Sequence, residues 1–270
     1  MYLTRHEAST GPRWAVDGNW LPAGFRLGMV LANSLADLRA ALADARGDEP
    51  AAGRVLAPIE DGQEVWAAGV TYLRSREARM AESATADIYD RVYDAERVEV
   101  FFKANGWRVV GQGGRIRVRP DSTWDVPEPE LALVLNRTGE IAGYAAGNDV
   151  SSRSIEGENP LYLPQAKVYD GSCALGPGIV VAHPDDMRDL PITLVIERRG
   201  VPVFDGETRT SRLKRSLEEI AKWLFADLAF PHGAFLMTGT GIVPPDEFSL
   251  APGDSVRVSL GDLVLVNEVA

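Results

Sequence analysis

The part of the chain after Glu99 consists of short β-strand patterns separated by glycine and proline, and this feature strongly limits the possible folds. Gly 26 and Pro 17 make about 16% of the 270 residues, above the roughly 12% of an average protein. Apolar runs bounded by such residues predict strands, here at residues 100–103, 115–119, 131–135, 179–182, 193–197 and 256–260. The pattern predicts an α+β fold dominated by a folded β-sheet.

The start of the chain predicts a small N-terminal α/β appendage. Ser34 can cap a helix, and the leucines at 35, 38 and 42 follow it at helical spacing. A loose stretch at residues 47–50 then leads toward the body. We therefore expect one domain at residues 1–58 and a second at 59–270. Further patterns predict a buried strand and two helices, at residues 65–70, 73–95 and 213–228.

The charge of the chain excludes several partners. Lys+Arg 28 against Asp+Glu 39 gives a net charge of −11. An acidic chain repels phosphate groups, so we expect neither a nucleic-acid nor a membrane partner. No apolar run approaches the roughly 18 residues of a membrane span, and the first residues lack the apolar segment of a signal peptide. The single cysteine, Cys173, excludes an internal disulfide. These features predict a cytoplasmic protein.

Missing motifs exclude several catalytic classes. The three histidines, His6, His183 and His232, are far apart, and no H-E-x-x-H zinc motif or G-x-S-x-G nucleophile motif occurs. The glycine-rich loops that bind nucleotide phosphates are also missing. Any chemistry must therefore rest mainly on carboxylates, lysines and arginines.

Two glutamates at the start of an apolar strand are the most informative feature. Glu128 and Glu130 flank Pro129 ahead of the sequence LALVL. Strand residues two apart point to the same face, so the two carboxylates are expected side by side. Like charges at this distance raise each other's pKa unless a cation compensates. If they bind a metal, oxygen ligands favour Mg²⁺, Mn²⁺ or Ca²⁺ over zinc. The simpler alternative is that the two glutamates are unrelated and solvated at a strand edge.

Asp149 is the candidate for a third ligand. It follows a predicted hairpin turn at residues 136–140 and a second short strand that can return the chain beside Glu130. Its alternative role is to cap the turn that contains Ser151. Arg153, Glu156 and Lys167 follow soon after, and an arginine and a lysine beside a metal site could bind an anionic substrate and stabilise an enolate.

At these residues the chain resembles the fumarylacetoacetate hydrolase superfamily, over about residues 60–270. The matching blocks are GVTY at 69–72, FFK at 101–103, EPELALV at 128–134, GNDVSSR at 147–153, LPQAKVYDGSCALGP at 163–177 and, toward the C-terminus, MTGTGIVPP with LAPGDSVRVSL and LVNEV. The resemblance implies a mixed β-roll, usually a homodimer or homotetramer. It also implies a Mg²⁺ ion held by Glu128, Glu130 and Asp149.

The resemblance further assigns roles to single residues. Lys167 matches a lysine that polarises the substrate oxygen or moves a proton. Substrate contacts are implied for Arg153, Thr240, Lys103 and Ser75. Ser75 stands where hydrolases of the family have a histidine that activates water, and Glu156 stands where they have a glutamine. Because serine is no base near neutral pH without help, hydrolysis by the usual route is disfavoured.

The residues in several of these blocks resemble those of the sugar-acid dehydratases of the superfamily. These enzymes convert 2-keto-3-deoxy-pentonates of the D-arabinonate or D-xylonate type to 2,5-dioxopentanoate. This branch implies a Mg²⁺-dependent lyase of pentose catabolism, for which Lys167, Glu99 and Glu156 are the candidate bases. The alternatives are an acylpyruvate hydrolase or oxaloacetate decarboxylase of the same superfamily, and a catalytically silent protein that binds sugar acids.

Overall fold

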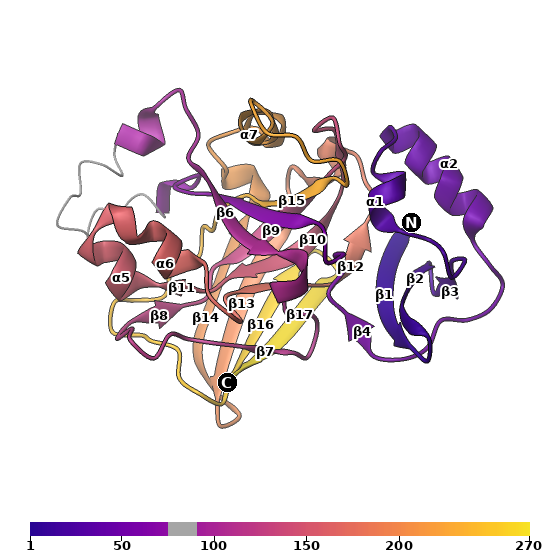
Figure 1. Cartoon of the computed structure of the whole chain (residues 1–270). Coiled ribbons are helices and arrows are strands. Elements are labelled where there is room, and N and C mark those ends of the chain that lie inside the picture. The colour runs from indigo at the N-terminus through magenta and orange to yellow at the C-terminus, as the bar shows by residue number, and fades with distance from the viewer. Residues whose placement is uncertain (75–90) are drawn as a thin grey trace.

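Two β-sheets that pack face to face form the body of the protein (Figure 1). The structure is a computed structural model that describes residues 1–74 and 91–270. In this part of the chain the larger sheet runs in the order β3 (Asn19–Trp20), β2 (Gly11–Val16), β1 (Tyr2–Ala8), β12 (Cys173–Val180), β10 (Ile141–Asp149), β9 (Pro129–Leu135), β15 (Ala234–Met237), β5 (Glu64–Ala68) and β6 (Val100–Asn105), with β4 (Val55–Leu56) beside β1.

The smaller sheet runs in the order β14 (Val201–Arg209), β13 (Pro191–Arg198), β16 (Asp254–Leu260), β17 (Leu263–Val269) and β7 (Arg115–Ile116). A separate pair joins β8 (Asp125–Val126) to β11 (Ser151–Ser152). The described α-helices are α1 (Leu27–Val30), α2 (Leu35–Ala45), α5 (Arg153–Glu158), α6 (Leu163–Lys167) and α7 (Leu217–Leu224). Short 3₁₀ helices occur at Gly106–Arg108, Pro160–Tyr162, Pro184–Met187 and Thr210–Arg212. The α+β prediction is confirmed.

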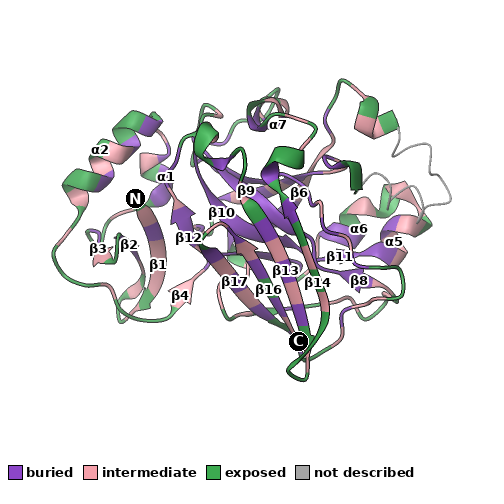
Figure 2. Ribbon diagram, turned by 180° about the vertical axis from the view of Figure 1, so that it is seen from behind, coloured by how far each residue is buried: buried purple, intermediate pink, exposed green. Residues whose placement is uncertain are grey.

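Strand β9 shows how the sequence divides the core. Its side chains alternate between the two faces of the sheet because a strand repeats every two residues. Leu131, Leu133 and Leu135 enter the core shared with the smaller sheet, and Ala132 and Val134 enter a second core on the opposite face. That second face is covered by α1 and α2 (Figure 1). Both faces of the central strands are therefore buried (Figure 2).

The hairpin between β9 and β10 forms as the sequence predicts. The side-chain oxygen of Asn136 accepts hydrogen bonds from the backbone N–H groups of Thr138 and Glu140, at 3.0 and 2.9 Å. The turn brings β10 back antiparallel to β9 and places Gly147 opposite Glu130. The hairpin thus positions the end of β10 beside the start of β9.

The positions of the strands in the N-terminal α/β appendage were not predicted. Strand β1 pairs with β12 through Tyr2–Val180 and Leu3–Ile179, so the larger sheet continues across position 58. Helix α2 forms behind its predicted cap, because the Ser34 hydroxyl accepts from the backbone N–H of Asp37 at 3.2 Å. The division into residues 1–58 and 59–270 stays a prediction.

Several element boundaries differ from the sequence pattern. Helix α7 is shorter than the predicted 213–228, because Ser216 caps its start and the helix ends before Phe225. Strand β12 begins earlier than the predicted 179–182, and β7 ends before the predicted residue 119. Most of the helix predicted at 73–95 lies outside the described residues. Among the helices that are described, none has the length and hydrophobicity of a membrane span.

Glu60 joins the N-terminal region to the body. Its carboxylate accepts from the Trp14 indole N–H at 3.0 Å and from the backbone N–H groups of Leu27 and Gly28 at 2.8 and 3.1 Å. Glu60→Ala leaves these donors without their acceptor and is expected to lower the free energy of unfolding by about 1–3 kcal/mol. Chemical denaturation measures the change. The exposed Asp48→Ala is the control, and equal stability of the two variants would contradict the prediction.

Candidate active site

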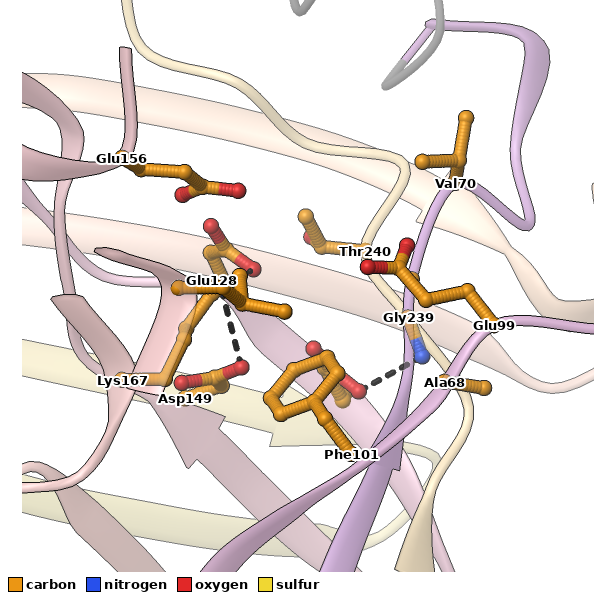
Figure 3. Close-up of a pocket in the computed structure, with 13 residues that line it drawn as sticks. Ala68, Val70, Glu99, Phe101, Glu128, Asp149, Glu156, Lys167, Gly239 and Thr240 are labelled. Carbon is orange, nitrogen blue, oxygen red and sulfur yellow. Dashed lines mark hydrogen bonds and ion pairs between the residues drawn. The ribbon is translucent and has the colours of Figure 1, made fainter. Parts of the chain in front are cut away.

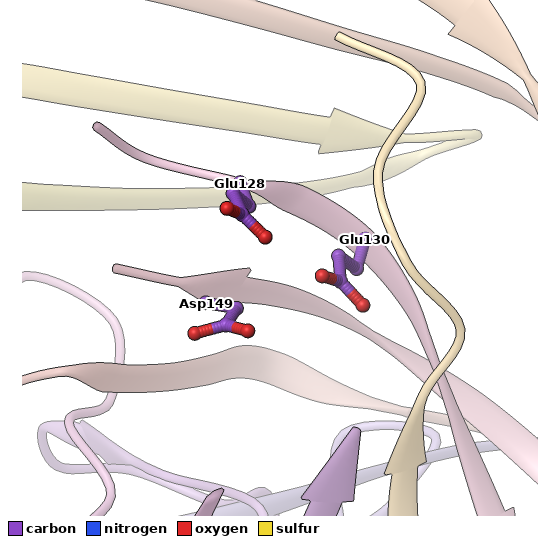
Figure 4. A group of neighbouring side chains, drawn as sticks. All are labelled: Glu128, Glu130 and Asp149. Carbon is purple, nitrogen blue, oxygen red and sulfur yellow. The ribbon is translucent and has the colours of Figure 1, made fainter. Parts of the chain in front are cut away.

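Three carboxylates converge at one end of the β9–β10 hairpin. Glu128 precedes β9, Glu130 lies within it, and Asp149 ends β10. One oxygen of each lies within 4.8 Å of the others, and all three side chains are buried (Figure 4). The backbone N–H of Asp149 donates to the carbonyl of Glu128 at 2.9 Å, which holds the two segments together. The pairing of the two strands therefore creates the cluster that the sequence analysis predicts.

Lys167 bridges two of these carboxylates. It is the last residue of α6, and its ammonium group lies 2.9 Å from Glu128 Oε2 and 3.0 Å from Asp149 Oδ2. The same group donates to Ser151 Oγ at 2.6 Å. Two of these three acceptors are carboxylates, so the lysine lies where positive charge is needed.

A second lysine lies beneath Asp149. The Lys103 side chain is completely buried, and its ammonium pairs with the Asp149 carboxylate. It also donates to the backbone carbonyls of Val150, at 3.1 Å, and of Lys167. These contacts fix Asp149 and the end of α6 in one place.

Arg153 pairs with the carboxylate oxygen of Glu128 that Lys167 does not contact. Its Nη2 lies 3.2 Å from Glu128 Oε1, and its side chain is 1% exposed. Arg153 opens helix α5, which follows β11, and β11 is held by its pairing with β8. The pairing of β11 with β8 and the start of α5 therefore fix the backbone position of this buried arginine.

Glu130 differs from the other two acids. Its Oε2 accepts from the backbone N–H of Gly239 at 2.6 Å, and within the described residues no lysine or arginine forms an ion pair with it. Burial raises the pKa of Glu130 well above its usual value, and the charges of Asp149 and Glu128 raise it further. Lys167 and the Gly239 N–H lower the pKa by less. The site thus favours an additional cation next to Glu130.

A cavity opens above the three carboxylates (Figure 3). Glu99 lies on one side of it with Val70 and Thr240, whereas Glu156 lies near Glu128. The lining residues are Ala68, Gly69, Val70, Glu99, Phe101, Glu128, Glu130, Asp149, Glu156, Leu163, Lys167, Gly239 and Thr240. The cavity thus combines a cluster of acids and one lysine with a small apolar wall.

The structure places the predicted residues at different depths. Glu99, Glu156, Lys167 and Thr240 line the cavity, together with the three predicted metal ligands. Lys103 and Arg153 lie behind the carboxylates and are not among the lining residues in the described part of the chain. Ser75 lies outside the described residues.

Two contributors were missed by the sequence analysis. Ser151 lies two residues beyond Asp149 and accepts from Lys167, and the strand period of two could have indicated it. Gly239 contributes only a backbone N–H, which no side-chain pattern reports. Its position between two threonines of the block TGT was the available signal.

Comparison with known proteins identifies the fold. The sequence model of the family described as "Fumarylacetoacetate (FAA) hydrolase C-terminal" matches residues 64–270. The chain belongs to the fumarylacetoacetate hydrolase family. The resemblance drawn from its sequence blocks is therefore confirmed.

Relatives within the fumarylacetoacetate hydrolase family carry dehydratase names. "Probable 2-keto-3-deoxyxylonate dehydratase" of Haloferax volcanii is 52% identical over 203 residues, or 74% of this chain and 69% of that protein. "2-dehydro-3-deoxy-D-arabinonate dehydratase" of Saccharolobus solfataricus is 44% identical over 217 residues, or 78% and 72%. A solved structure of 2-keto-3-deoxy-D-arabinonate dehydratase with magnesium and 2,5-dioxopentanoate matches at a TM-score of 0.84 and 35% identity, covering 100% of this chain and 98% of that one.

The residues of this family member fit a divalent cation. Glu128, Glu130 and Asp149 offer only oxygen atoms, which suit Mg²⁺ best and also Mn²⁺ or Ca²⁺. The carboxylate without an ion-pair partner among the described residues, Glu130, is where added positive charge is most needed. The chemistry of the donor set therefore supports the predicted metal site.

The raised pKa of Glu130 makes a prediction about stability. A carboxyl whose pKa is raised by folding contributes stability below its usual pKa of about 4.5, and this stability is lost as pH rises through the raised value. In metal-free protein at pH 7.5, Glu130→Gln is therefore expected to raise Tm by at least about 2 °C, with no gain at pH 4.5. Thermal unfolding in EDTA at both pH values measures this.

The same variant is expected to lose the stabilisation that Mg²⁺ gives to the wild type. The exposed Glu158→Gln serves as the control and should match the wild type in both respects. A lower Tm of Glu130→Gln at pH 7.5 in EDTA would show that the cluster tolerates the third negative charge without a metal.

Proposed function

We propose that this protein is a Mg²⁺-dependent dehydratase that converts a 2-keto-3-deoxy-pentonate to 2,5-dioxopentanoate in non-phosphorylative pentose catabolism. The observation that carries the proposal is the buried cluster of Glu128, Glu130 and Asp149 with Lys167, enclosed in one cavity. It occurs in a chain that is 52% and 44% identical to proteins named as dehydratases of this substrate class. The enzyme is accordingly a lyase.

The overall reaction removes water from the substrate. A base takes a proton from C3, the C4 hydroxyl leaves with a proton as water, and further proton shifts from C5 to C3 and C4 leave the aldehyde at C5. A divalent ion held by Glu128, Glu130 and Asp149 supplies Lewis acidity toward the 2-oxo acid, which makes the C3 protons more acidic. The protein must supply the proton transfers.

Lys167 is suited to give a proton rather than to take one. It donates to Glu128, Asp149 and Ser151, and two of these partners are carboxylates. An ammonium at this position stabilises negative charge that develops on the substrate oxygen. Glu99 and Glu156 therefore remain the candidate bases, and both line the cavity.

The other assigned residues have supporting roles in this proposal. Thr240 lines the cavity, which supports its proposed contact with the substrate carboxylate. Arg153 orients Glu128, and Lys103 orients Asp149, because each is buried behind the carboxylate with which it pairs. Substrate contact by Arg153, Lys103 and Ser75 stays a prediction.

The setting of the reaction is also part of the proposal. We expect a cytoplasmic homodimer or homotetramer with a small N-terminal domain at residues 1–58 and a catalytic domain at 59–270. The net charge of −11 supports a small-molecule substrate rather than a nucleic acid.

Purified protein is expected to form 2,5-dioxopentanoate from 2-keto-3-deoxy-D-arabinonate or its 4-epimer, and only when Mg²⁺ is present. Coupling to an aldehyde dehydrogenase that oxidises the product measures the rate. Glu128→Gln and Lys167→Met are each expected to lower kcat/KM at least about 10²-fold, because each removes a charged group from the site. The exposed Glu158→Gln should keep wild-type activity.

Full activity in EDTA, or a Glu128→Gln variant that keeps both metal and turnover, would contradict this mechanism. Pyruvate release from acylpyruvates or oxaloacetate without dehydration would identify the hydrolase or decarboxylase alternative. Tight, Mg²⁺-dependent binding of the sugar acid without turnover would identify a binding protein.

A further inference from the structure

We infer that Gly69 is a positioning residue: its missing side chain provides the space in the cavity wall that the Glu99 carboxylate occupies. The inference rests on the proposed dehydratase function, in which Glu99 is one of two candidate bases. It adds a residue whose effect on the reaction passes entirely through Glu99.

The two residues are in direct contact across neighbouring strands. Glu99 precedes β6 and Gly69 follows β5, and the backbone N–H of Gly69 donates to the carbonyl of Glu99 at 3.2 Å. A Cβ atom at Gly69 would lie 2.1 Å from Glu99 Oε2 and 2.8 Å from its Cδ. Both residues line the cavity, and Figure 3 shows the Glu99 carboxylate on the side of the cavity where Thr240 lies. The carboxylate therefore packs directly over the Gly69 Cα.

Backbone conformation does not explain this glycine. Gly69 is not among the glycines with a positive φ, whereas Gly239 on the facing loop has φ +91°. A position without a left-handed φ accepts L-residues. The requirement at Gly69 is thus one of space beside Glu99.

The segment that carries Gly69 is fixed on its other side. The next residue, Val70, has φ +52°, which is unusual for a β-branched residue and is maintained only where surrounding contacts impose it. The Thr71 hydroxyl donates to the carbonyl of Thr238 at 2.6 Å, and Tyr72 is 2% exposed. Gly69 is consequently held in place and cannot move away from Glu99 at low cost.

An added methyl group at Gly69 must therefore move Glu99. The atom that it meets is the terminal oxygen of a flexible side chain, which yields more readily than backbone. A Cβ at Gly106 would instead meet the backbone oxygen of Glu60 at 2.0 Å, and backbone yields far less readily. Gly69→Ala should consequently fold and bind Mg²⁺ while its carboxylate at position 99 is displaced.

The test is a double-mutant cycle on the intact enzyme. Gly69→Ala is expected to lower kcat for the pentonate about 10²-fold, because a base displaced by about 1 Å loses its alignment with the proton it removes. Glu99→Asp is shorter by one methylene and relieves the overlap. In that background Gly69→Ala should change kcat less than about threefold, which gives a strong coupling between the two positions.

Matched measurements separate positioning from a general structural effect. Gly62→Ala is the control, because nothing lies within 4 Å of a Cβ at Gly62. Tm and the Kd for Mg²⁺ should agree among wild type, Gly62→Ala and Gly69→Ala. An active wild type with an equally active Gly69→Ala, or an equal loss from Gly69→Ala in the wild-type and Glu99→Asp backgrounds, would overturn the inference. An inactive wild type would instead overturn the proposed function.

Discussion

Three carboxylates are buried together at the end of the β9–β10 hairpin, and their mutual repulsion must be offset by positive charges from neighbouring elements. Buried charges of one sign are costly unless cations and hydrogen-bond donors lie beside them. Lys167, Lys103 and Arg153 each pair with Glu128 or Asp149, and each comes from a different element. The positions of α5, α6 and β6 relative to the hairpin are therefore coupled to one charge cluster.

The two lysines are both buried, but within the described part of the chain Lys167 lines the cavity and Lys103 does not. Lys103 is 0% exposed, pairs with Asp149 and donates to backbone carbonyls. Its charge therefore stabilises the fold around Asp149. Lys167 pairs with the same aspartate from the cavity side and reaches the space where a substrate would lie. Side chains of the same chemistry thus act on one carboxylate from opposite sides. Three acids buried side by side lower the stability of the fold, as is general for active sites whose function requires a destabilising arrangement.

The sequence was most informative where side-chain chemistry and local geometry coincide. The spacing of Glu128 and Glu130 placed them on one face because a strand repeats every two residues, and the turn at Asn136 returned Asp149 to them. Contacts made by the backbone, such as the Gly239 N–H, leave no such trace. The space at Gly69 is filled by Glu99 from a distant part of the sequence, so it too could not be predicted from the local pattern. The ends of α7 were misjudged because apolar periodicity continued beyond the cap at Ser216.

The pairing of β1 with β12 has a consequence for synthesis of the chain. Tyr2 lies opposite Val180, so the strand made first has to wait for one made much later. At roughly 5–20 residues per second this delay is on the order of 10–40 s. During that interval β1 can pair only with its local neighbours β2 and β4, and its remaining edge stays open to unrelated strands. The growing polypeptide thus carries an edge that favours aggregation until β12 has left the ribosome.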